Sequence, residues 1–349
     1  MNMSKKLFDF AIGNPPYQEE SQGENKALSM PVYHKFMDAA KEVSDVVELI
    51  HPARFLFKTG RTPNEFNDRK LNDEHFKILH YEPNPANIFP NTEIKGGVVI
   101  SLQDENKNFG KIETFIPSDT LRKAFEHVWR NPNHNTKSIY DMISPRLMFR
   151  YSEILFDDYL DLDRTSGPLH AVQSDAFDKN SRMFKENDIF NGGYKFWGKI
   201  KGVKDRVWRY IDPKYIEDNP YLNKWKVFMP RSNGSGAFGE VLAKPAVGGP
   251  GTGGTDTFIC IGPMETEDEA NAILQYIKTK FVRAMLSILK TTQGNTRPAW
   301  KYVPLQDFTS KSDIDWSKSI HEIDLQLYRK YGLSAEEVAF IETNVKEME

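Results

Sequence analysis

Four consecutive residues, Asn14-Pro15-Pro16-Tyr17, combine groups that can hold a planar amino compound. Two successive prolines keep the backbone extended and leave two positions without an N–H donor. The Asn14 side-chain oxygen and the Pro15 carbonyl are therefore both able to accept hydrogen bonds from one amino group. Accepting both hydrogens pushes electron density onto the nitrogen, which can then attack an electrophilic methyl group. Tyr17 adds a flat face on which the planar group can stack.

The apolar segment directly before this tetrapeptide, residues 7–12, predicts a short, largely buried strand that ends at Gly13. Strand-like segments follow at 46–50, 77–81 and 97–102, and a helix-like pattern begins after Pro31. Alternating strands and helices with short links favour an α/β fold with a mostly parallel sheet. Functional loops lie at the carboxyl ends of such strands, where we expect Asn14. The alternative is a turn that merely ends the strand.

From about residue 130 the sequence becomes irregular, aromatic and rich in turns, which indicates a second domain. Residues 232–254 are rich in glycine and favour loops. Thr266 and Glu269 form the pattern of a capping box, which predicts a long helix from there toward Gly294. Its apolar stripe, most simply interpreted as core, consists of Ile273, Ile277, Phe281, Ala284 and Ile288.

Residues 9–18, DFAIGNPPYQ, resemble motif IV of the N6-adenine DNA methyltransferases. Within that family they are most similar to the methylase parts of restriction–modification enzymes, including single-chain methylase–nuclease fusions. Residues 49–56 resemble the strand and loop that follow, and residues 89–100 resemble motif VIII. Residues 278–283 and 300–304 are similar to the closing part of the family's target-recognition region.

The resemblance implies a role for each residue of the motif. Asn14 and Pro15 would accept the amino group of an adenine flipped out of double-stranded DNA, and Pro16 would hold the turn. Tyr17 and Phe89 would stack on its two faces, and S-adenosylmethionine would donate the methyl group. The implied fold is a partial Rossmann-like methyltransferase domain at 1–130, followed by an α+β target-recognition domain at 131–349.

In this family the glycine-rich loop that binds S-adenosylmethionine lies well before motif IV, whereas only 13 residues precede Asn14. We therefore expect an incomplete cofactor site, with cofactor-binding residues unknown. A second polypeptide would supply the missing half, or the chain is a truncated product. Residues 249–253 have suitable glycines but are followed by a strand-like segment. Residues 234–241 match a kinase glycine loop without the other kinase motifs.

Charge is distributed unevenly although the net charge is only −3. Residues 195–245 hold eleven Lys and Arg against five Asp and Glu, and residues 270–303 hold six against none. Residues 305–349 hold five against ten. This pattern favours a basic second domain that meets phosphates, although solvated charged faces give the same pattern. The expected DNA contacts are Arg231, beside a mobile glycine-rich loop, and Asn233, Arg297, Trp300 and Lys301; core packing is an equal alternative for Trp300.

Several classes of function are disfavoured. The single Cys260 excludes a disulfide framework, and the scattered histidines show no metal-binding spacing. Glu93-Ile94-Lys95 imitates the tripeptide of a nuclease centre, but such tripeptides are common by chance. A mean hydropathy of −0.58, without a long apolar run, predicts no membrane span, and no signal peptide is evident, so a cytoplasmic location is expected.

The sequence therefore predicts an adenine-specific DNA methyltransferase component of a restriction–modification system. Two alternatives stay open. The first is a non-catalytic DNA-binding or specificity subunit that needs a partner for the cofactor site. The second is methylation of a protein glutamine, because the same tetrapeptide can hold a side-chain amide; the long basic second domain argues against it.

Overall fold

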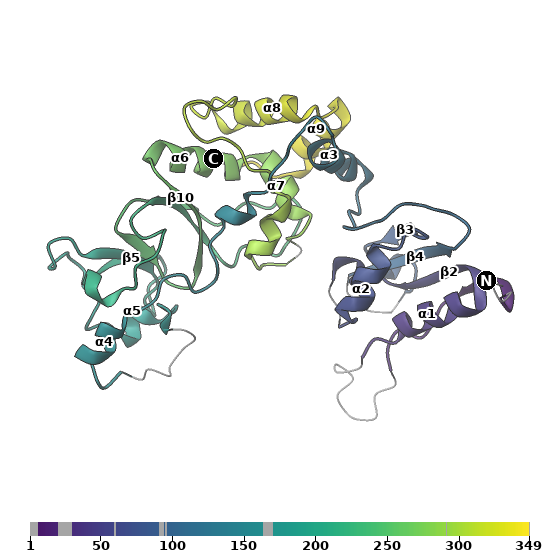
Figure 1. The fold of residues 1–349 in the computed structure, drawn as a ribbon, viewed down its shortest axis with the longest axis horizontal. Coiled ribbons are helices and arrows are strands. Elements are labelled where there is room, and N and C mark those ends of the chain that lie inside the picture. Colours follow the sequence, from purple (N-terminus) through teal and green to yellow (C-terminus); the bar gives the residue numbers. More distant parts are fainter. Residues whose placement is uncertain are drawn as a thin grey trace. The chain divides into compact units, whose positions relative to one another are not determined.

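The computed structural model describes residues 6–19, 30–58, 61–90, 94, 96–162, 170–290 and 292–348. The chain forms two compact units, Met1–Pro117 and Ser118–Glu349 (Figure 1). Helix α3 (Asp119–Trp129) belongs to the second unit. The ring centroid of its buried residue Phe125 lies 4.9 Å from that of Tyr302 in the same unit. The division thus comes before α3 rather than after it, where the composition change suggested a boundary near residue 130.

Unit 1 is built on one four-stranded sheet with the order β1-β2-β4-β3. Strand β1 pairs in parallel with β2, and β4 is antiparallel to both β2 and β3. Three strands therefore point the same way, and the mostly parallel sheet expected is a mixed one with β4 reversed. The elements are β1 (Phe8–Gly13), α1 (Tyr33–Val43), β2 (Ser44–Pro52), η2 (Arg54–Phe57), α2 (Asn64–Leu71), β3 (Phe76–Glu82), η3 (Pro85–Asn87) and β4 (Val98–Asp104).

The two faces of this sheet differ in what covers them. On one face, Val47, Leu49 and Val99 are buried against residues of α1 and α2, among them Met37 and Phe66 (Figure 1). On the other face, β1 presents three large apolar side chains to solvent. These are Phe8, Phe10 and Ile12, which are 59%, 68% and 80% exposed. Alternation along a strand places these three on the face opposite the core.

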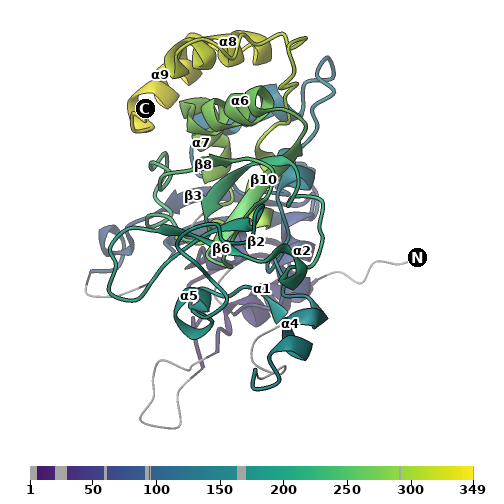
Figure 2. The ribbon, with the colours of Figure 1, turned by 90° about the vertical axis from the view of Figure 1, so that its left-hand side faces the viewer.

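Unit 2 contains two three-stranded sheets, β6-β5-β9 and β10-β7-β8. Figures 1 and 2 show α6 to α9 on one side of these strands and α4 and α5 on the opposite side. The remaining elements are η4 (Ile139–Met142), α4 (Glu153–Asp158), α5 (Ala176–Lys179), β5 (Tyr194–Gly198), β6 (Val207–Ile211), η6 (Pro213–Tyr215), β7 (Trp225–Pro230), β8 (Ala246–Gly248), β9 (Thr252–Gly254), β10 (Phe258–Met264), α6 (Glu267–Lys278), α7 (Lys280–Ser287), η7 (Arg297–Tyr302), α8 (Ile320–Tyr331) and α9 (Ala335–Asn344).

The long helix expected after Thr266 is two helices. Its start is confirmed, because Thr266 and Glu269 form the capping box at α6. Thr279 then leaves the helical region, with φ −59° and ψ 150°, and its hydroxyl accepts a hydrogen bond from the Val282 N–H to begin α7. All five residues of the predicted apolar stripe are buried, so its assignment to the core is confirmed.

None of the helices in the described ranges is long and apolar enough to cross a membrane.

Candidate functional site

The predicted motif lies at the carboxyl end of β1. The strand ends at Gly13, which pairs with Leu49 of β2, and the tetrapeptide follows at the edge of the sheet. Asn14 and Pro16 are exposed, Pro15 is buried, and Tyr17 is half-buried. The predicted strand and the position of the motif directly after it are therefore confirmed. The expected burial of the strand is wrong, because Phe8, Phe10 and Ile12 are exposed.

Backbone hydrogen bonds hold the far end of this loop. The Val32 N–H donates to the Tyr17 carbonyl at 3.1 Å, and the Glu19 N–H donates to the Met30 carbonyl at 2.9 Å. The segment that leads into α1 therefore fixes Tyr17. By contrast, neither the Asn14 side chain nor the Pro15 carbonyl accepts a hydrogen bond from any residue that the structure describes. Within the described part of the chain, two acceptors next to each other in the sequence thus have no hydrogen-bond donor.

Phe89 follows β3, which is parallel to β1, so it reaches the same end of the sheet as the tetrapeptide. Its N–H donates to the Pro85 carbonyl at 2.8 Å, so the short η3 turn fixes the start of its loop. The rings of Tyr17 and Phe89 lie 6.3 Å apart between centroids, with an angle of 73° between their planes. The structure therefore brings the two predicted aromatic residues together. They meet edge to face, whereas a base stacked on both faces needs the rings parallel.

The Tyr17 hydroxyl is buried and has no hydrogen-bond partner among the described residues. Burial raises the pKa of this phenol above its usual value, so it stays neutral at physiological pH. A neutral ring suits a stacking role and offers no base for proton transfer.

A buried histidine that the sequence did not single out supports the neighbouring strand end. His51 of β2 stacks on Tyr33 at the start of α1, with 5.6 Å between ring centroids and 6° between planes. Its Nε2 lies 2.7 Å from the Ser101 hydroxyl. Burial lowers the pKa of His51 to about 4, so the ring is neutral at physiological pH. The only sequence signal is a histidine within an apolar strand, followed by Pro52.

Two of the residues expected to contact DNA are structural. Trp300 is completely buried, and its indole N–H donates to Asn295 Oδ1 at 2.9 Å. Asn233 is buried as well; its Nδ2 donates to the Val241 carbonyl at 2.9 Å, and its Oδ1 accepts the Ala243 N–H. Both side chains have their polar groups satisfied inside the core, so neither reaches a ligand on the surface.

The other three expected contacts keep part of their charge at the surface. Arg231 donates to the Asp256 carbonyl at 3.0 Å, and Arg297 lies over the Tyr140 ring at 4.3 Å. Lys301 is exposed, 5.3 Å from the centroid of the Tyr302 ring. These three side chains remain predictions as DNA contacts.

The glycine-rich segment expected to be a mobile DNA-binding loop is fixed by a carboxylate of its own. The Glu240 carboxylate accepts the N–H groups of Ser235 and Gly236 at 2.8 and 3.1 Å, and it pairs with Lys290. Backbone N–H groups that converge in this way form a typical anion site. Because Glu240 is already the anion, the segment has no free site for a phosphate.

The second glycine-rich segment, residues 249–253, packs against aromatic rings. A Cβ on Gly253 would lie 2.5 Å from the Phe196 ring, and one on the neighbouring Gly248 would lie 2.2 Å from the Phe228 ring. These glycines allow β8 and β9 to approach the core closely. Strand β9 begins within this segment and strand β10 follows it, so no helix begins directly after this loop. Neither glycine segment therefore fits the S-adenosylmethionine expected from the resemblance.

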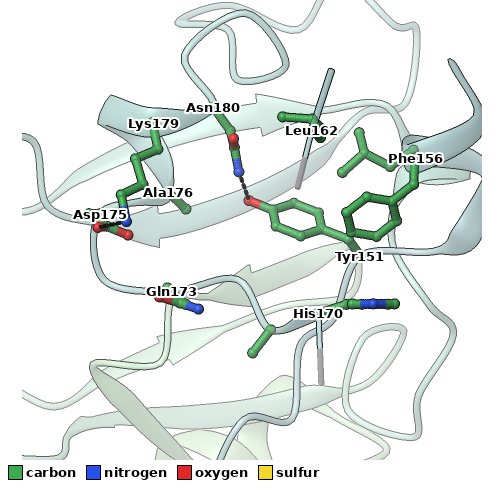
Figure 3. Close-up of a pocket in the computed structure, with 11 residues that line it drawn as sticks. Tyr151, Phe156, Leu162, His170, Gln173, Asp175, Ala176, Lys179 and Asn180 are labelled. Carbon is green, nitrogen blue, oxygen red and sulfur yellow. Dashed lines mark hydrogen bonds and ion pairs between the residues drawn. The ribbon is translucent and has the colours of Figure 1, made fainter. Parts of the chain in front are cut away.

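A cavity of about 110 Å³ lies in unit 2 beside α5 (Figure 3). Its polar side chains pair with one another: Asn180 donates to the Tyr151 hydroxyl at 3.1 Å, and Lys179 pairs with Asp175 at 2.8 Å. Pockets that hold cofactor-sized ligands measure roughly 300 to 1,000 Å³, so this cavity is too small for a nucleoside.

The described residues contain no group of three His, Cys, Asp or Glu that could hold a metal ion. Glu93 and Lys95 of the nuclease-like tripeptide lie outside the described residues.

Comparison with known proteins finds a similarity in the region that holds the motif. Residues 1–89 match the model of the Eco57I restriction-modification methylase family. The type IIG restriction endonuclease BpuSI gives a structural match with 11% identity and a TM-score of 0.37, over 90% of this chain and 48% of that one. The type IIL restriction-modification enzyme MmeI in complex with DNA gives 9% identity and a TM-score of 0.35, over 96% and 56%. The chain thus spans about half the length of these structures. Comparison with curated proteins gives no match.

Proposed function

We propose that this chain supplies the base-binding loop and the DNA-binding unit of an adenine-specific DNA methyltransferase of the restriction–modification type. The observation that carries the proposal is a pair of acceptors at the carboxyl end of β1, beside Tyr17 and Phe89: the acceptors of Asn14 and Pro15 have no hydrogen-bond donor among the described residues. The match of residues 1–89 to a restriction-modification methylase family supports it. In this proposal unit 1 is part of a Rossmann-like catalytic domain, and unit 2 is the target-recognition domain.

The chemistry that these residues offer suits an exocyclic amino group. The Asn14 side-chain oxygen and the Pro15 carbonyl would each accept one of its hydrogens, which holds the nitrogen and raises its electron density. The proton can leave after the nitrogen has reacted, so no general base is needed at the start. An adenine in duplex DNA reaches this loop only when it is flipped out, at a cost of a few kcal/mol. Contacts with Tyr17 and Phe89 would offset part of that cost.

S-adenosylmethionine is the methyl donor that the proposal implies, yet neither the two glycine-rich segments nor the cavity beside α5 fits it. We therefore propose that a further part, either a second polypeptide or another segment of the same protein, carries the cofactor site. Strand β1 is where it would attach. The strand lies at the edge of the sheet, and Phe8, Phe10 and Ile12 leave its outer face apolar and exposed. An added strand would pair with the free edge, and added helices would cover that face.

The test is transfer of tritiated methyl groups from S-adenosylmethionine to duplex DNA, by the chain alone and together with the protein encoded next to it. We expect N6-methyladenine in the DNA from the complete assembly. Asn14→Ala should lower the rate about 10²- to 10³-fold, the usual cost of losing one positioned hydrogen-bonding group. Asn106→Ala is the matched control, because Asn106 follows β4 at the opposite end of the sheet.

Equal rates for Asn14→Ala and the parent chain would overturn the catalytic role. Label in a protein glutamine rather than in DNA would identify the other substrate that this tetrapeptide can hold. Binding of DNA without methyl transfer under any condition would instead identify a non-catalytic specificity subunit.

A further inference from the structure

The hairpin formed by β5 and β6 is the most basic surface segment of unit 2. Between residues 195 and 210 it holds six Lys and Arg side chains and one carboxylate, Asp205. The six are Lys195, Lys199, Lys201, Lys204, Arg206 and Arg209. Strands β5 and β6 pair antiparallel from Tyr194 and Ile211 to Gly198 and Val207, so the charges lie on one connected element.

The lysines of the connecting turn are exposed and unpaired. Within the described ranges, no carboxylate lies at ion-pair distance from Lys199, Lys201 or Lys204. Some exposed lysines of unit 2 do have such partners; Lys214, for example, pairs with Asp158 at 2.8 Å. The carboxylates nearest the turn are Asp205 within it and Asp178, which accepts the backbone N–H of Lys201. The turn therefore keeps a local excess of positive charge.

A stack of rings fixes the strands that carry this turn. Trp197 lies between Trp208 and Phe258, at 5.6 and 4.6 Å between ring centroids and nearly parallel to both. Cations lie beside these rings: Lys195 lies 5.1 Å from the centroid of Trp208, and Arg206 lies 4.9 Å from that of Phe258 and 5.9 Å from that of Trp197. These contacts join β5, β6 and β10 into one rigid assembly.

This stack also decides which ligand the hairpin can take. Proteins that bind single strands use free aromatic faces on which bases stack. Here rings cover both faces of Trp197, and Lys195 lies over Trp208. The stacked tryptophans therefore offer no free platform for a base, and the hairpin presents charge on a rigid support. Regularly spaced phosphates of duplex DNA are the partner that fits such a surface.

We propose that the β5–β6 hairpin, through Lys199, Lys201 and Lys204, contacts the sugar–phosphate backbone of duplex DNA. The proposal rests on the proposed function, to which it adds a surface that was not expected from the sequence as a site of its own. Phosphate contacts position a protein on the duplex and carry no sequence information directly. The hairpin would therefore contribute affinity and orientation, while other residues read the bases.

The test measures the dissociation constant of the full chain for a 20-base-pair duplex, of roughly the length of a specific binding site, at several salt concentrations, without cofactor. Each phosphate contact contributes about 0.9 to the slope of log affinity against log salt. The variant Lys199→Gln/Lys201→Gln/Lys204→Gln should reduce that slope by about 2 to 3 and weaken binding to all duplex sequences alike. The control is Lys311→Gln/Lys318→Gln/Lys346→Gln, which removes three exposed lysines from the acidic C-terminal segment. It should leave the slope unchanged.

An unchanged slope in the hairpin variant, or an equal loss in the control, would overturn the proposal. So would a loss confined to single-stranded DNA of the same length, which would indicate base stacking instead. Far-ultraviolet circular dichroism confirms that both variants are folded. Asn14→Ala separates this proposal from the proposed function, because it should lower methyl transfer about 10²- to 10³-fold while leaving the salt slope intact.

Discussion

The sheet of unit 1 and the sheets of unit 2 use apolar strands in different ways. In unit 2, large side chains on the strands such as Phe196 and Phe228 are completely buried, because helices and the second sheet cover them. In unit 1, helices cover one face, and Phe8, Phe10 and Ile12 lie open on the other. The same pattern in sequence, a short apolar strand, therefore ends in burial in one unit and in exposure in the other.

Exposing the apolar face of β1 to water is unfavourable, and this cost indicates that the face serves an interaction. A contiguous apolar patch on a surface strand marks an interaction site, and an uncovered edge strand invites pairing with another chain. Strand β1 combines both features and protects itself with a single charge, Asp9. The strands of unit 2 are covered by helices and a second sheet, whereas one face of the unit 1 strand β1 is exposed.

The strongest test of this difference between the units is to place charged side chains on the exposed face of β1. Phe10→Lys with Ile12→Lys should lower methyl transfer by the assembled enzyme at least about 100-fold, because a covered lysine without a partner costs several kcal/mol. The fold of unit 1 should survive, since both side chains are exposed in it. The control, Leu160→Lys with Ile189→Lys, charges two apolar side chains that are equally exposed in unit 2. Full activity in the β1 variant would show that nothing covers this face.

The stability of unit 2 should be most sensitive to a substitution in its buried core. Trp300→Ala should lower the free energy of unfolding of unit 2 by about 3 to 5 kcal/mol, the usual cost of emptying a buried tryptophan site. All six tryptophans lie at or after residue 129, so their fluorescence during urea unfolding reports on unit 2. Lys301→Ala, a change of the exposed neighbour, should have an effect within about 0.5 kcal/mol. A mild loss in Trp300→Ala would mean that this region is less tightly packed.

Acid should affect unit 1 through His51. Its pKa of about 4 lies below the usual value near 6.5, so the unfolded chain takes up the proton first as the pH falls. The stability of unit 1 should therefore decrease between pH 6.5 and 4, by about 3 kcal/mol in total. Hydrogen exchange of the β2 and β4 amides, corrected for intrinsic rates, measures this decrease. His51→Phe keeps a ring against Tyr33 and should flatten the dependence; an unchanged dependence would assign it to other groups.

Unit 2 should show the opposite sign, through a smaller effect at Asp324. This buried carboxylate accepts the N–H groups of Lys280 and Phe281 at 2.9 and 2.8 Å, and burial raises its pKa to about 7. The folded chain thus holds the proton more tightly, and stability should rise by about 2 kcal/mol as the pH falls from 7 to 5. Tryptophan fluorescence in urea measures it. Asp324→Asn should lose this rise; if it does not, other groups cause it.

Local features of the sequence predicted the local features of the fold. The strand before Asn14, the position of the motif at its end and the capping box at Thr266 depend on neighbouring residues, and all three are confirmed. The break at Thr279 was not predictable in this way. It is stabilised by Asp324, which lies 44 residues after Lys280 in the chain.

The candidate site was predicted in part for the same reason. The resemblance paired Tyr17 with Phe89, and the rings do meet, but their angle depends on loops that no local pattern determines. Asn233 was expected at the surface, and for Trp300 a DNA contact and core packing were equal alternatives, because basic residues and glycines surround them in the sequence. Their partners Asn295, Val241 and Ala243 are met only in the folded chain. The direction of β4 likewise has no signal in its apolar pattern.

A ligand that enters this site competes with the contact between the Tyr17 and Phe89 rings. At 6.3 Å and 73°, each ring occupies space next to the other that a flat ligand would need. An edge-to-face pair is worth about 0.5 to 1.5 kcal/mol beyond the area that it buries. Any planar molecule that is to lie between these rings must therefore displace one of them first. A ligand that binds this site more weakly than the two rings bind each other would leave the contact between them intact.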